Sequence, residues 1–204
     1  DARLRPFGSA GPLSVSLAAL EAYLLQHGRD WERYAYIKAR VVNPWDDADG
    51  LYRDVLRPFI YRRYLDYGVF SSLREMKAMI AAEVEKKEYR ANLKLGPGGI
   101  REIEFIVQAL QLVRGGTVLG LRQQQLLRAL PQLVQAGCLP AADAADLETA
   151  YCFLRLAENR VQALHDRQTH DIPADPLDQQ RLAFAMGMAG WDEFLAALNV
   201  QRER

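Results

Sequence analysis

AADAADLETAYCFLRLAENRVQALHDRQ, residues 141–168, is the stretch with the longest helical pattern in the chain. Pro140 stands directly before it, at a place where the first turn of a helix tolerates proline. Apolar side chains recur at helical spacing over about six turns, at Leu147, Ala150, Leu154, Ala157, Val161 and Leu164. The stretch therefore predicts a long helix with one buried face.

The same periodicity recurs through the rest of the chain. It predicts further helices over 13–27, 30–40, 51–61, 66–89, 100–114, 121–136, 176–188 and 191–204. Gly28 is expected to stop the first of these, and Pro58 to interrupt or kink the third. Only residues 2–5 and 92–95 look extended. The predicted fold class is mainly α, a helical bundle with a short β remnant at the N-terminus.

Composition excludes several classes of protein. The 204 residues carry 26 Lys and Arg against 26 Asp and Glu, which removes the electrostatic case for a nucleic-acid or membrane-surface binder. The balance hides a split, because residues 1–101 hold 17 basic and 13 acidic side chains, whereas 102–204 hold 9 and 13. An anionic ligand is therefore expected to bind in the first half.

Targeting and redox signals point to the cytoplasm. No secretory signal opens the chain, and the longest uncharged run, 129–142, contains two prolines and cannot span a bilayer. Cys138 and Cys152 form no metal or disulfide pattern, which is typical of a reducing compartment. The chain starts at Asp1 without a methionine, so we expect it to be a piece of a longer protein.

KLGPGGIREIEFIVQ, Lys94–Gln108, is the strongest candidate site. Three glycines within four residues stand directly before a predicted helix, where backbone N–H groups and the helix dipole favour an anion such as phosphate. The candidate contacts are Lys94, Gly98, Gly99 and Arg101. No Gly-Lys-Ser/Thr follows, so the stretch is not a Walker A loop. A glycine turn with a purely structural role is the alternative.

The helix predicted to follow this loop has one polar face, formed by Arg101, Glu104, Gln108 and Gln111. On the simpler interpretation this face is solvated. Glu102 and Glu104 then do no more than offset the dipole in the first turn.

The segment Asp1-Ala2-Arg3-Leu4-Arg5 is a second candidate site. In a strand, its carboxylate and two guanidinium groups fall on the same side. Such a set suits a divalent metal beside a polyphosphate, with Asp1 on the metal and Arg3 and Arg5 on phosphate oxygens. A frayed, solvated terminus is the alternative.

Two further patterns leave alternatives open. DWERYAYIKAR, Asp30–Arg40, combines aromatic and basic side chains that suit a nucleotide, or that form the edge of a core with snorkelling cations. The pairs His165-Asp166 and His170-Asp171 resemble metal dyads, but helix caps and C-terminal cations explain them more simply. The basic run at Arg53, Arg57, Arg62 and Arg63 is interpreted as an exposed or partner-facing helix face.

Three blocks in order resemble one family. DARLRPFGSAGPL (1–13), GRDWERYAYIKARVV (28–42) and NLKLGPGGIREIEFIVQALQLVRGG (92–116) are similar to successive blocks of bacterial bifunctional glutamine synthetase adenylyltransferase/adenylyl-removing enzymes. That family has two nucleotidyltransferase domains of the DNA polymerase β-like class, each followed by a helical domain. Arg101-Glu102 in the third block resembles the amino-terminal, adenylyl-removing half.

The resemblance implies a domain division and a reaction. Residues 1–45 would be the C-terminal remnant of a nucleotidyltransferase domain, and 46–204 its helical bundle. The removing half uses phosphate to release AMP from a tyrosyl group of glutamine synthetase as ADP, while the other half adds AMP from ATP. Both are in-line displacements at phosphorus assisted by Mg2+. The P-II signal protein is the expected regulatory partner.

The resemblance also implies roles for single residues. Asp1 matches the third metal-binding carboxylate, and the other two, an Asp-x-Asp pair, are expected upstream of it. We therefore expect these 204 residues alone to be inactive. The resemblance implies that Arg3, Arg5 and Lys38 contact phosphate or nucleotide. It also implies that Lys94, Arg101, Glu102 and Glu104 lie on the edge of the helical domain that faces the site.

Two other interpretations remain open. In one, the bundle is chiefly a docking and regulatory module for glutamine synthetase or P-II. In the other, the chain belongs to the related enzyme that uridylylates P-II, although that enzyme is expected to carry a metal-binding HD domain that this sequence does not show.

Overall fold

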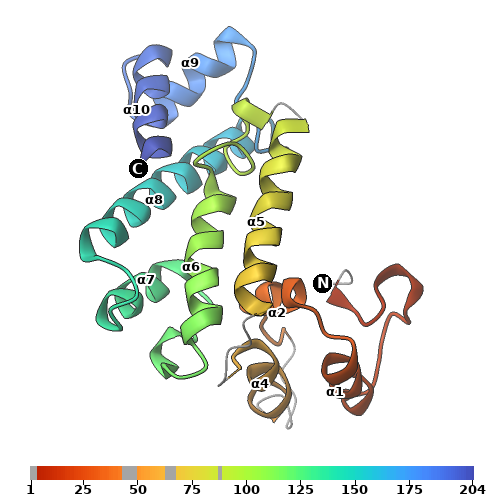
Figure 1. The fold of residues 1–204 in the computed structure, drawn as a ribbon. Coiled ribbons are helices and arrows are strands. Elements are labelled where there is room, and N and C mark those ends of the chain that lie inside the picture. The colour runs from red at the N-terminus through yellow and green to blue at the C-terminus, as the bar shows by residue number, and fades with distance from the viewer. Residues whose placement is uncertain (1–3, 43–49, 63–67, 87–88) are drawn as a thin grey trace. The chain divides into compact units, whose positions relative to one another are not determined.

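The computed structural model describes residues 4–42, 50–62, 68–86 and 89–204, and the part described is mainly helical (Figure 1). The α-helices are α1 (Leu17–Gln26), α2 (Asp30–Tyr36), α4 (Arg57–Ile60), α5 (Gly68–Lys86), α6 (Ile100–Arg114), α7 (Leu126–Gln135), α8 (Ala141–His165), α9 (Pro176–Ala185) and α10 (Trp191–Glu203). Short turns of 3-10 helix are η2 (Gly8–Ala10), η4 (Tyr89–Ala91) and η5 (Leu119–Leu121), and η3 (Leu51–Leu56) is a π-helix. The chain divides into two compact units.

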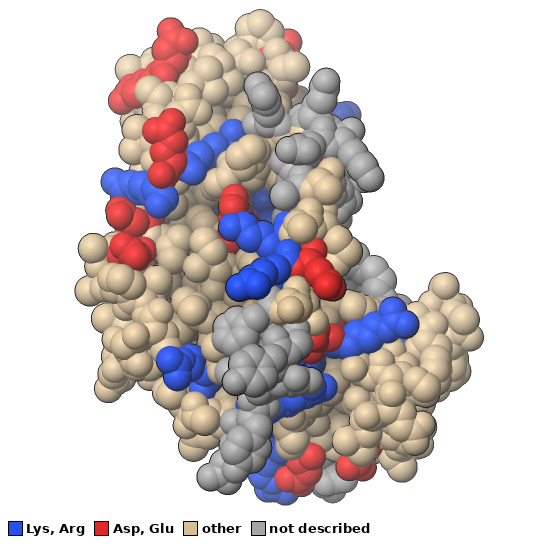
Figure 2. Space-filling model, in the orientation of Figure 1, with Lys and Arg blue, Asp and Glu red and all other residues tan. Residues whose placement is uncertain are grey.

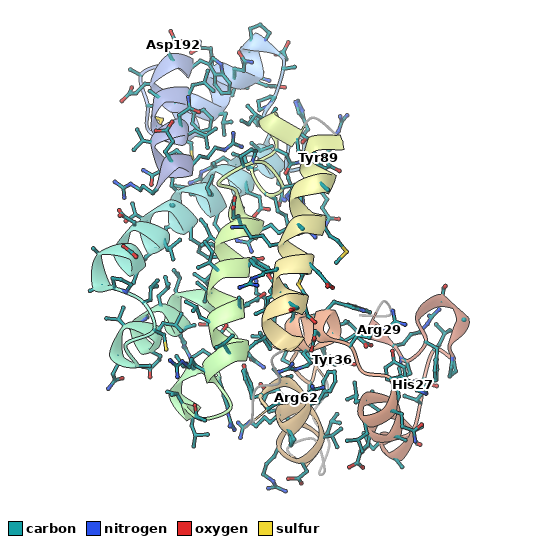
Figure 3. The ribbon with its side chains drawn as sticks, in the orientation of Figure 1. His27, Arg29, Tyr36, Arg62, Tyr89 and Asp192 are labelled. Carbon is teal, nitrogen blue, oxygen red and sulfur yellow. The ribbon has the colours of Figure 1, made fainter. Side chains whose placement is uncertain are left out.

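Unit 1 comprises residues 1–76 and 108–136. Within it α2 packs on α4, α4 on η3, and α7 on η5. Tyr36 lies at the end of α2 (Figure 3). Its ring meets that of Phe59 in α4 edge to face, with 6.0 Å between the ring centroids. Its core is formed by apolar side chains from these elements, including Ile37, Leu56, Ile60, Leu121, Leu130 and Leu133.

Unit 2 comprises residues 77–107 and 137–204. Helices α8, α9 and α10 all pack against one another. Phe194 in α10 is fully buried and stacks on Trp191, with 5.1 Å between the ring centroids. The line predicted from the opening stretch is confirmed at its centre. Its buried members are Ala150, Leu154, Ala157 and Val161, while Leu147 and Leu164 are half-buried.

Several helix ends differ from prediction for local reasons. The first helix begins at Leu17 rather than Leu13, because the Ser16 hydroxyl caps it by accepting the Ala19 N–H at 3.2 Å. The second helix ends at Tyr36 rather than residue 40, with Arg29 at its N-cap position and Asp30 as its first helical residue. The break expected near Pro58 is the π-helix η3 directly before α4. The helix predicted over 121–136 begins only at Leu126, and the other helices agree with their predicted ranges to within a few residues where both are described.

The predicted β remnant is not confirmed. Residues 2 and 3 of that segment lie outside the described residues, and Leu4 and Arg5 enter a series of turns in which the Gly8 N–H donates to the Arg5 carbonyl at 3.0 Å. The second extended segment, 92–95, is also turn-like after Asn92. Within the described residues the structure contains no strand, and an isolated bridge joins Asn92 to Asp171. The boundary predicted near residue 45 lies outside the described residues and stays a prediction.

Candidate functional site

The described part of the N-terminal segment is joined to α2 by a hydrogen bond. Asp1 and Arg3 lie outside the described residues. The Arg5 guanidinium is half-buried and turns back on its own chain, donating to the Gly8 carbonyl at 2.6 Å and the Ser9 carbonyl at 3.4 Å. The Tyr36 hydroxyl donates to the Leu4 carbonyl at 3.1 Å, which attaches this segment to α2.

A buried carboxylate connects α1 to α2. Glu32 is 1% exposed, and its two oxygens accept the Tyr23 hydroxyl and the Arg29 N–H, each at 2.8 Å. Burial and the neighbouring Glu32 carboxylate raise the pKa of Tyr23. These contacts make Asp30–Arg40 a structural link as well as a candidate binding segment. Lys38, a predicted nucleotide contact, is exposed just beyond the end of α2.

Arg33 is the residue of this segment that the sequence analysis missed. Its side chain is fully buried and donates to the Phe59 carbonyl at 3.1 Å and the Ile60 carbonyl at 3.0 Å. It also pairs with Asp30 at 2.9 Å. Burial lowers the pKa of Arg33, whereas burial alone would raise that of Asp30, which hydrogen bonds from Ser72 and Arg33 bring below its usual range. The spacing of Asp30 and Arg33 on one helix face was the available signal.

The glycine loop before α6 uses its own N–H groups. The carbonyls of Leu93, Lys94 and Gly99 accept the first N–H groups of α6, and Asn92 and Gly96 accept those of the loop, at 2.8–3.3 Å. The Gly98 N–H donates to the Glu102 carboxylate at 3.0 Å. Every N–H from Lys94 to Ile103 therefore has a partner within the chain. This geometry favours the structural interpretation of the loop, and phosphate binding by Gly98 and Gly99 stays a prediction.

The same loop packs against the end of α10. Gly98 has a φ of +62°, and a β-carbon there would overlap the backbone of Arg202. The Arg202 guanidinium donates to the Asn92 carbonyl at 2.9 Å, and burial lowers the pKa of Arg202. The Asn92 amide donates to the Asp171 carboxylate at 2.6 Å. Asn92 thus joins the loop to two segments that follow it by 79 and 110 residues.

The polar face of α6 is not solvated as the simpler interpretation expected. Gln108 and Gln111 are 4% and 2% exposed, and the Gln111 amide donates to the carbonyls of Leu121 and Gln123 at 2.7 and 2.8 Å. Lys94 and Arg101, the candidate phosphate contacts at the helix start, are half-buried.

Glu104 belongs to a charged cluster in unit 2 that was not predicted. Arg155 donates to Glu104 and Glu158, each at 2.7 Å, and to the Tyr151 hydroxyl at 3.1 Å. Burial by itself lowers the pKa of Arg155, but the hydrogen bond to Glu158 and the contacts with Tyr151 and Glu104 together raise it. His170 Nδ1 lies 2.7 Å from a Glu158 oxygen, although without the direction of a hydrogen bond. Glu104 is therefore held by an arginine of its own chain.

Both histidines of the His-Asp pairs lie against acidic side chains of unit 2. His165 lies 2.6 Å from Asp178, which also accepts Arg181 at 2.9 Å, and these partners hold the pKa of the Asp178 carboxyl below its usual range. Asp166 ends α8 in the left-handed conformation. Among the residues described, no group of three or more His, Cys, Asp or Glu side chains is arranged to hold a metal ion.

The candidate residues thus fall into two sets, each described within its own unit. Arg5 and Lys38 lie in unit 1, and the loop residues with Glu104 lie in unit 2. Acidic and basic side chains are mixed over the face shown in Figure 2. None of the helices in the described ranges has both the length and the apolar character needed to cross a membrane.

Two family models match different parts of the chain. The family model described as GlnD PII-uridylyltransferase matches residues 74–204. The chain belongs to this family. A second model, described as glutamate-ammonia ligase adenylyltransferase, matches residues 1–52. The model that matches residues 74–204 is thus named for the P-II uridylylating enzyme that the sequence left open as an alternative. The model that matches residues 1–52 is named for the adenylyltransferase that the sequence resembles.

Curated relatives match over the whole length. Proteins of Stenotrophomonas maltophilia (strain R551-3) and Xanthomonas axonopodis pv. citri (strain 306), each called a bifunctional glutamine synthetase adenylyltransferase/adenylyl-removing enzyme, are 52% identical to it over all 204 residues. The resemblance found in the sequence is confirmed. The chain spans about a fifth of the length of these relatives, 22% in both cases.

Proposed function

We propose that the chain is part of an enzyme that removes AMP from a tyrosyl residue of glutamine synthetase by phosphorolysis, and that another part of the same enzyme adds AMP from ATP. The observation that carries this proposal is 52% identity over all 204 residues to enzymes named for both activities. The match of residues 1–52 to the adenylyltransferase model supports it independently. The Arg101-Glu102 pair supports the amino-terminal, adenylyl-removing half.

The proposed reaction is an in-line displacement. An oxygen of inorganic phosphate attacks the phosphorus of the AMP group, a new P–O–P bond forms, and the bond to the tyrosyl oxygen breaks. The tyrosyl oxygen takes up a proton, and ADP leaves. Because charge spreads over the phosphoryl oxygens, positioning and charge neutralisation supply most of the catalysis. In the proposal, Arg3, Arg5 and Lys38 are the cations that hold phosphate or nucleotide.

Mg2+ enters the proposal through Asp1. A carboxylate is the kind of oxygen ligand that Mg2+ binds, and the ion, when bound, would neutralise phosphate charge. One carboxylate completes no site, because a bound Mg2+ ion takes several oxygen ligands. We therefore propose that the other ligands come from the Asp-x-Asp pair, that the 204 residues alone are inactive, and we assign no step to the ion.

The glycine loop has a narrower role in this proposal than its sequence indicated. Its N–H groups already have partners within the chain, so a phosphate contact there falls to the side chains of Lys94 and Arg101. Glu102 and Glu104 then position the loop and α6 rather than the substrate, since Glu102 accepts the Gly98 N–H and Glu104 pairs with Arg155. The domain division at residue 45 belongs to the same proposal.

Replacement of Asp1 tests the proposal in the whole enzyme. Asp1→Asn is expected to reduce phosphorolysis of adenylylated glutamine synthetase by roughly 100-fold or more, because a metal ligand supplies several kcal/mol of charge stabilisation. Transfer of AMP from ATP by the same variant is expected to stay near normal. Loss of AMP transfer alone would assign the chain to the other half. Retention of both activities would overturn the role of Asp1.

We propose a second function for the helical part, docking of the P-II signal protein. The observation that favours it is the match of residues 74–204 to a model named for an enzyme that acts on PII. Glutamine synthetase is the other protein that the helical part would bind in this proposal. In this proposal the enzyme and both partners are cytoplasmic. Cys152, an exposed and unbridged thiol, fits the reducing conditions of the cytoplasm.

A binding measurement separates the two functions. The 204-residue chain, immobilised, is expected to bind P-II or glutamine synthetase saturably if docking is its main task, with bovine serum albumin as the negative control. Binding of neither partner would reject docking. The phosphorolysis proposal would still stand on the Asp1→Asn result.

A further inference from the structure

A polar pocket of unit 1 is used by neither proposed function. It measures about 270 Å³ and is lined by Tyr52 of η3, Arg57 of α4, Arg122, Arg128 of α7, and the glutamines at 123–125. Pockets that hold whole small molecules are commonly about 300–1,000 Å³. The size therefore suits a compact polar group rather than a large apolar ligand, and no acidic side chain of the described residues lines it.

Three guanidinium groups meet at this pocket without a carboxylate. The ion pairs of unit 1 found among the described residues are Arg33 with Asp30 and Arg53 with Asp54, and neither involves Arg57, Arg122 or Arg128. Like charges gathered in one pocket repel, so an anion bound among the three arginines would be stabilised by neutralising that repulsion. Arg57 was expected to lie on an exposed or partner-facing helix face, and its side chain is exposed.

Two of the three arginines are held in fixed orientations. The Arg57 guanidinium lies over the ring of Tyr52, 5.0 Å from its centroid, and that of Arg122 lies over Tyr61 at 5.4 Å. Arg122 also donates from Nε to the Gly115 carbonyl at 2.8 Å and from Nη2 to Gly116 at 3.3 Å. Stacking leaves the in-plane N–H groups of Arg57 available to phosphate or carboxylate oxygens. Arg122 uses its Nε–Nη2 edge for the two carbonyls, so its Nη1 side is the part that a ligand can reach.

The start of α7 adds a second feature of the same sign. Gln125 precedes the helix and makes no side-chain cap, and no described residue accepts a hydrogen bond from the backbone N–H groups of residues 124–127. Arg128 is in the first turn of α7, a ten-residue helix whose N-terminus carries partial positive charge. The arginines and the uncapped helix start therefore favour the same kind of ligand, a multiply charged oxyanion.

We propose that this pocket binds a phosphoryl group, from inorganic phosphate or from the phosphates of a nucleotide, through Arg57, Arg122 and Arg128. The planar forks of the arginines and the row of N–H groups supply many donors, and a tetrahedral phosphoryl group has more acceptor oxygens to receive them than a carboxylate. Bound phosphate would link α4 to α7 and stabilise unit 1. The proposal involves none of the residues assigned to the proposed reaction.

The test measures binding rather than activity. Phosphate, pyrophosphate, ADP and ATP are titrated separately into the full chain by calorimetry, with acetate and sodium chloride at matched ionic strength as controls. The unaltered chain is expected to bind at least one phosphate-bearing probe saturably. The variant Arg57→Gln/Arg128→Gln is expected to bind that probe at least about tenfold more weakly, because each lost charge-assisted hydrogen bond is a large share of the affinity.

A matched variant removes the same charge elsewhere. Arg114→Gln/Arg160→Gln replaces two exposed arginines outside the pocket and is expected to leave binding unchanged. Circular dichroism of both variants shows whether the helices remain. Tighter binding of phosphate identifies the free ion as ligand, and tighter binding of ADP or ATP identifies a nucleotide. The proposal is overturned if acetate binds as well as phosphate, if no probe binds saturably, or if the two folded variants bind alike.

Discussion

Arg33 shows how much of unit 1 depends on one side chain. Its guanidinium is fully buried, and it satisfies the carbonyls of Phe59 and Ile60 while it pairs with Asp30. A buried carbonyl that loses its donor is destabilising, because it stays desolvated and water cannot reach it to form a replacement hydrogen bond. Arg33 thus fixes the distance between α2 and α4, a role that an apolar side chain of similar length cannot fill.

Replacement of Arg33 by methionine tests this role. Arg33→Met is expected to lower the free energy of unfolding by about 2–4 kcal/mol, because two buried carbonyls lose their donor and Asp30 loses its ion pair. Arg40→Met, at an exposed position nearby, is expected to change it by no more than about 0.5 kcal/mol. Urea unfolding followed by circular dichroism measures both. Equal effects of the two substitutions would contradict the structural role of Arg33.

Two buried tyrosines of unit 1 differ in whether the hydroxyl group has a hydrogen-bond partner. The Tyr36 hydroxyl donates to the Leu4 carbonyl, whereas the Tyr61 hydroxyl, on a side chain that is 4% exposed, has no hydrogen-bond partner among the described residues. Tyr36→Phe is expected to cost about 1 kcal/mol in the free energy of unfolding at pH 7, and Tyr61→Phe to cost nothing or to gain up to about 1 kcal/mol. Urea midpoints decide between this order and its reverse.

At the scale of elements, the contact between the glycine loop and α10 decides which residue position 98 accepts. Gly98→Ala must adopt a positive φ and also displace the backbone of Arg202. Gly187→Ala pays only for a positive φ of +76°, because a β-carbon there meets no atom within 4 Å. We expect a cost of about 1–2 kcal/mol for Gly187→Ala and a distinctly larger one for Gly98→Ala. Thermal unfolding of the two variants measures the difference, and equal costs would show that α10 yields freely.

Helices could be predicted where the information is local, and their ends and polar contacts could not. The apolar line through Leu154 and Val161 was readable because its spacing alone places those residues on one face. Leu13 fits the same spacing but is 83% exposed, since the Ser16 cap starts the helix later. Gln111 looks like a surface residue in sequence, because the carbonyls that it satisfies lie ten and twelve residues away.

The candidate site was less predictable than the fold for the same reason. The glycines before α6 match an anion loop in spacing, but spacing does not reveal that the loop's N–H groups find carbonyls and Glu102 within the chain. Glu104 looked like a site-facing carboxylate, and its partner Arg155 is 51 residues away. What the sequence did predict is the likeness to bifunctional adenylyltransferase/adenylyl-removing enzymes, because three long blocks preserve order as well as composition.

Over the whole molecule, buried and partly buried phenols make the free energy of unfolding depend on alkaline pH. Burial raises the pKa of Tyr23, Tyr36, Tyr61 and Tyr151, so these groups ionise in the unfolded chain first, near their ordinary value of 10.0. The free energy of unfolding is therefore expected to fall as the pH rises above about 10. Tyr61→Phe is expected to reduce that slope by up to about 1.4 kcal/mol per pH unit.

The acid side has the opposite sign. The lowered pKa of Asp30 contributes stability that is present above its ordinary value of 3.8 and is lost as the pH falls below it. Urea midpoints from pH 3 to 11 are expected to show a plateau with a fall at each end. An alkaline fall that is equally steep in Tyr61→Phe would rule out the role given to that phenol.

The bonds of Asn92 also bear on the order in which the chain becomes structured during synthesis. Its side chain accepts the N–H groups of Lys94 and Leu95 while its amide donates to Asp171, and its carbonyl receives Arg202. A ribosome that has released the glycine loop must add about a hundred residues before the last of these partners emerges. At about 5–20 residues per second, the loop and the start of α6 wait several seconds for α10. During that interval the loop lacks the hydrogen bonds to Asp171 and Arg202 and is open to chaperones.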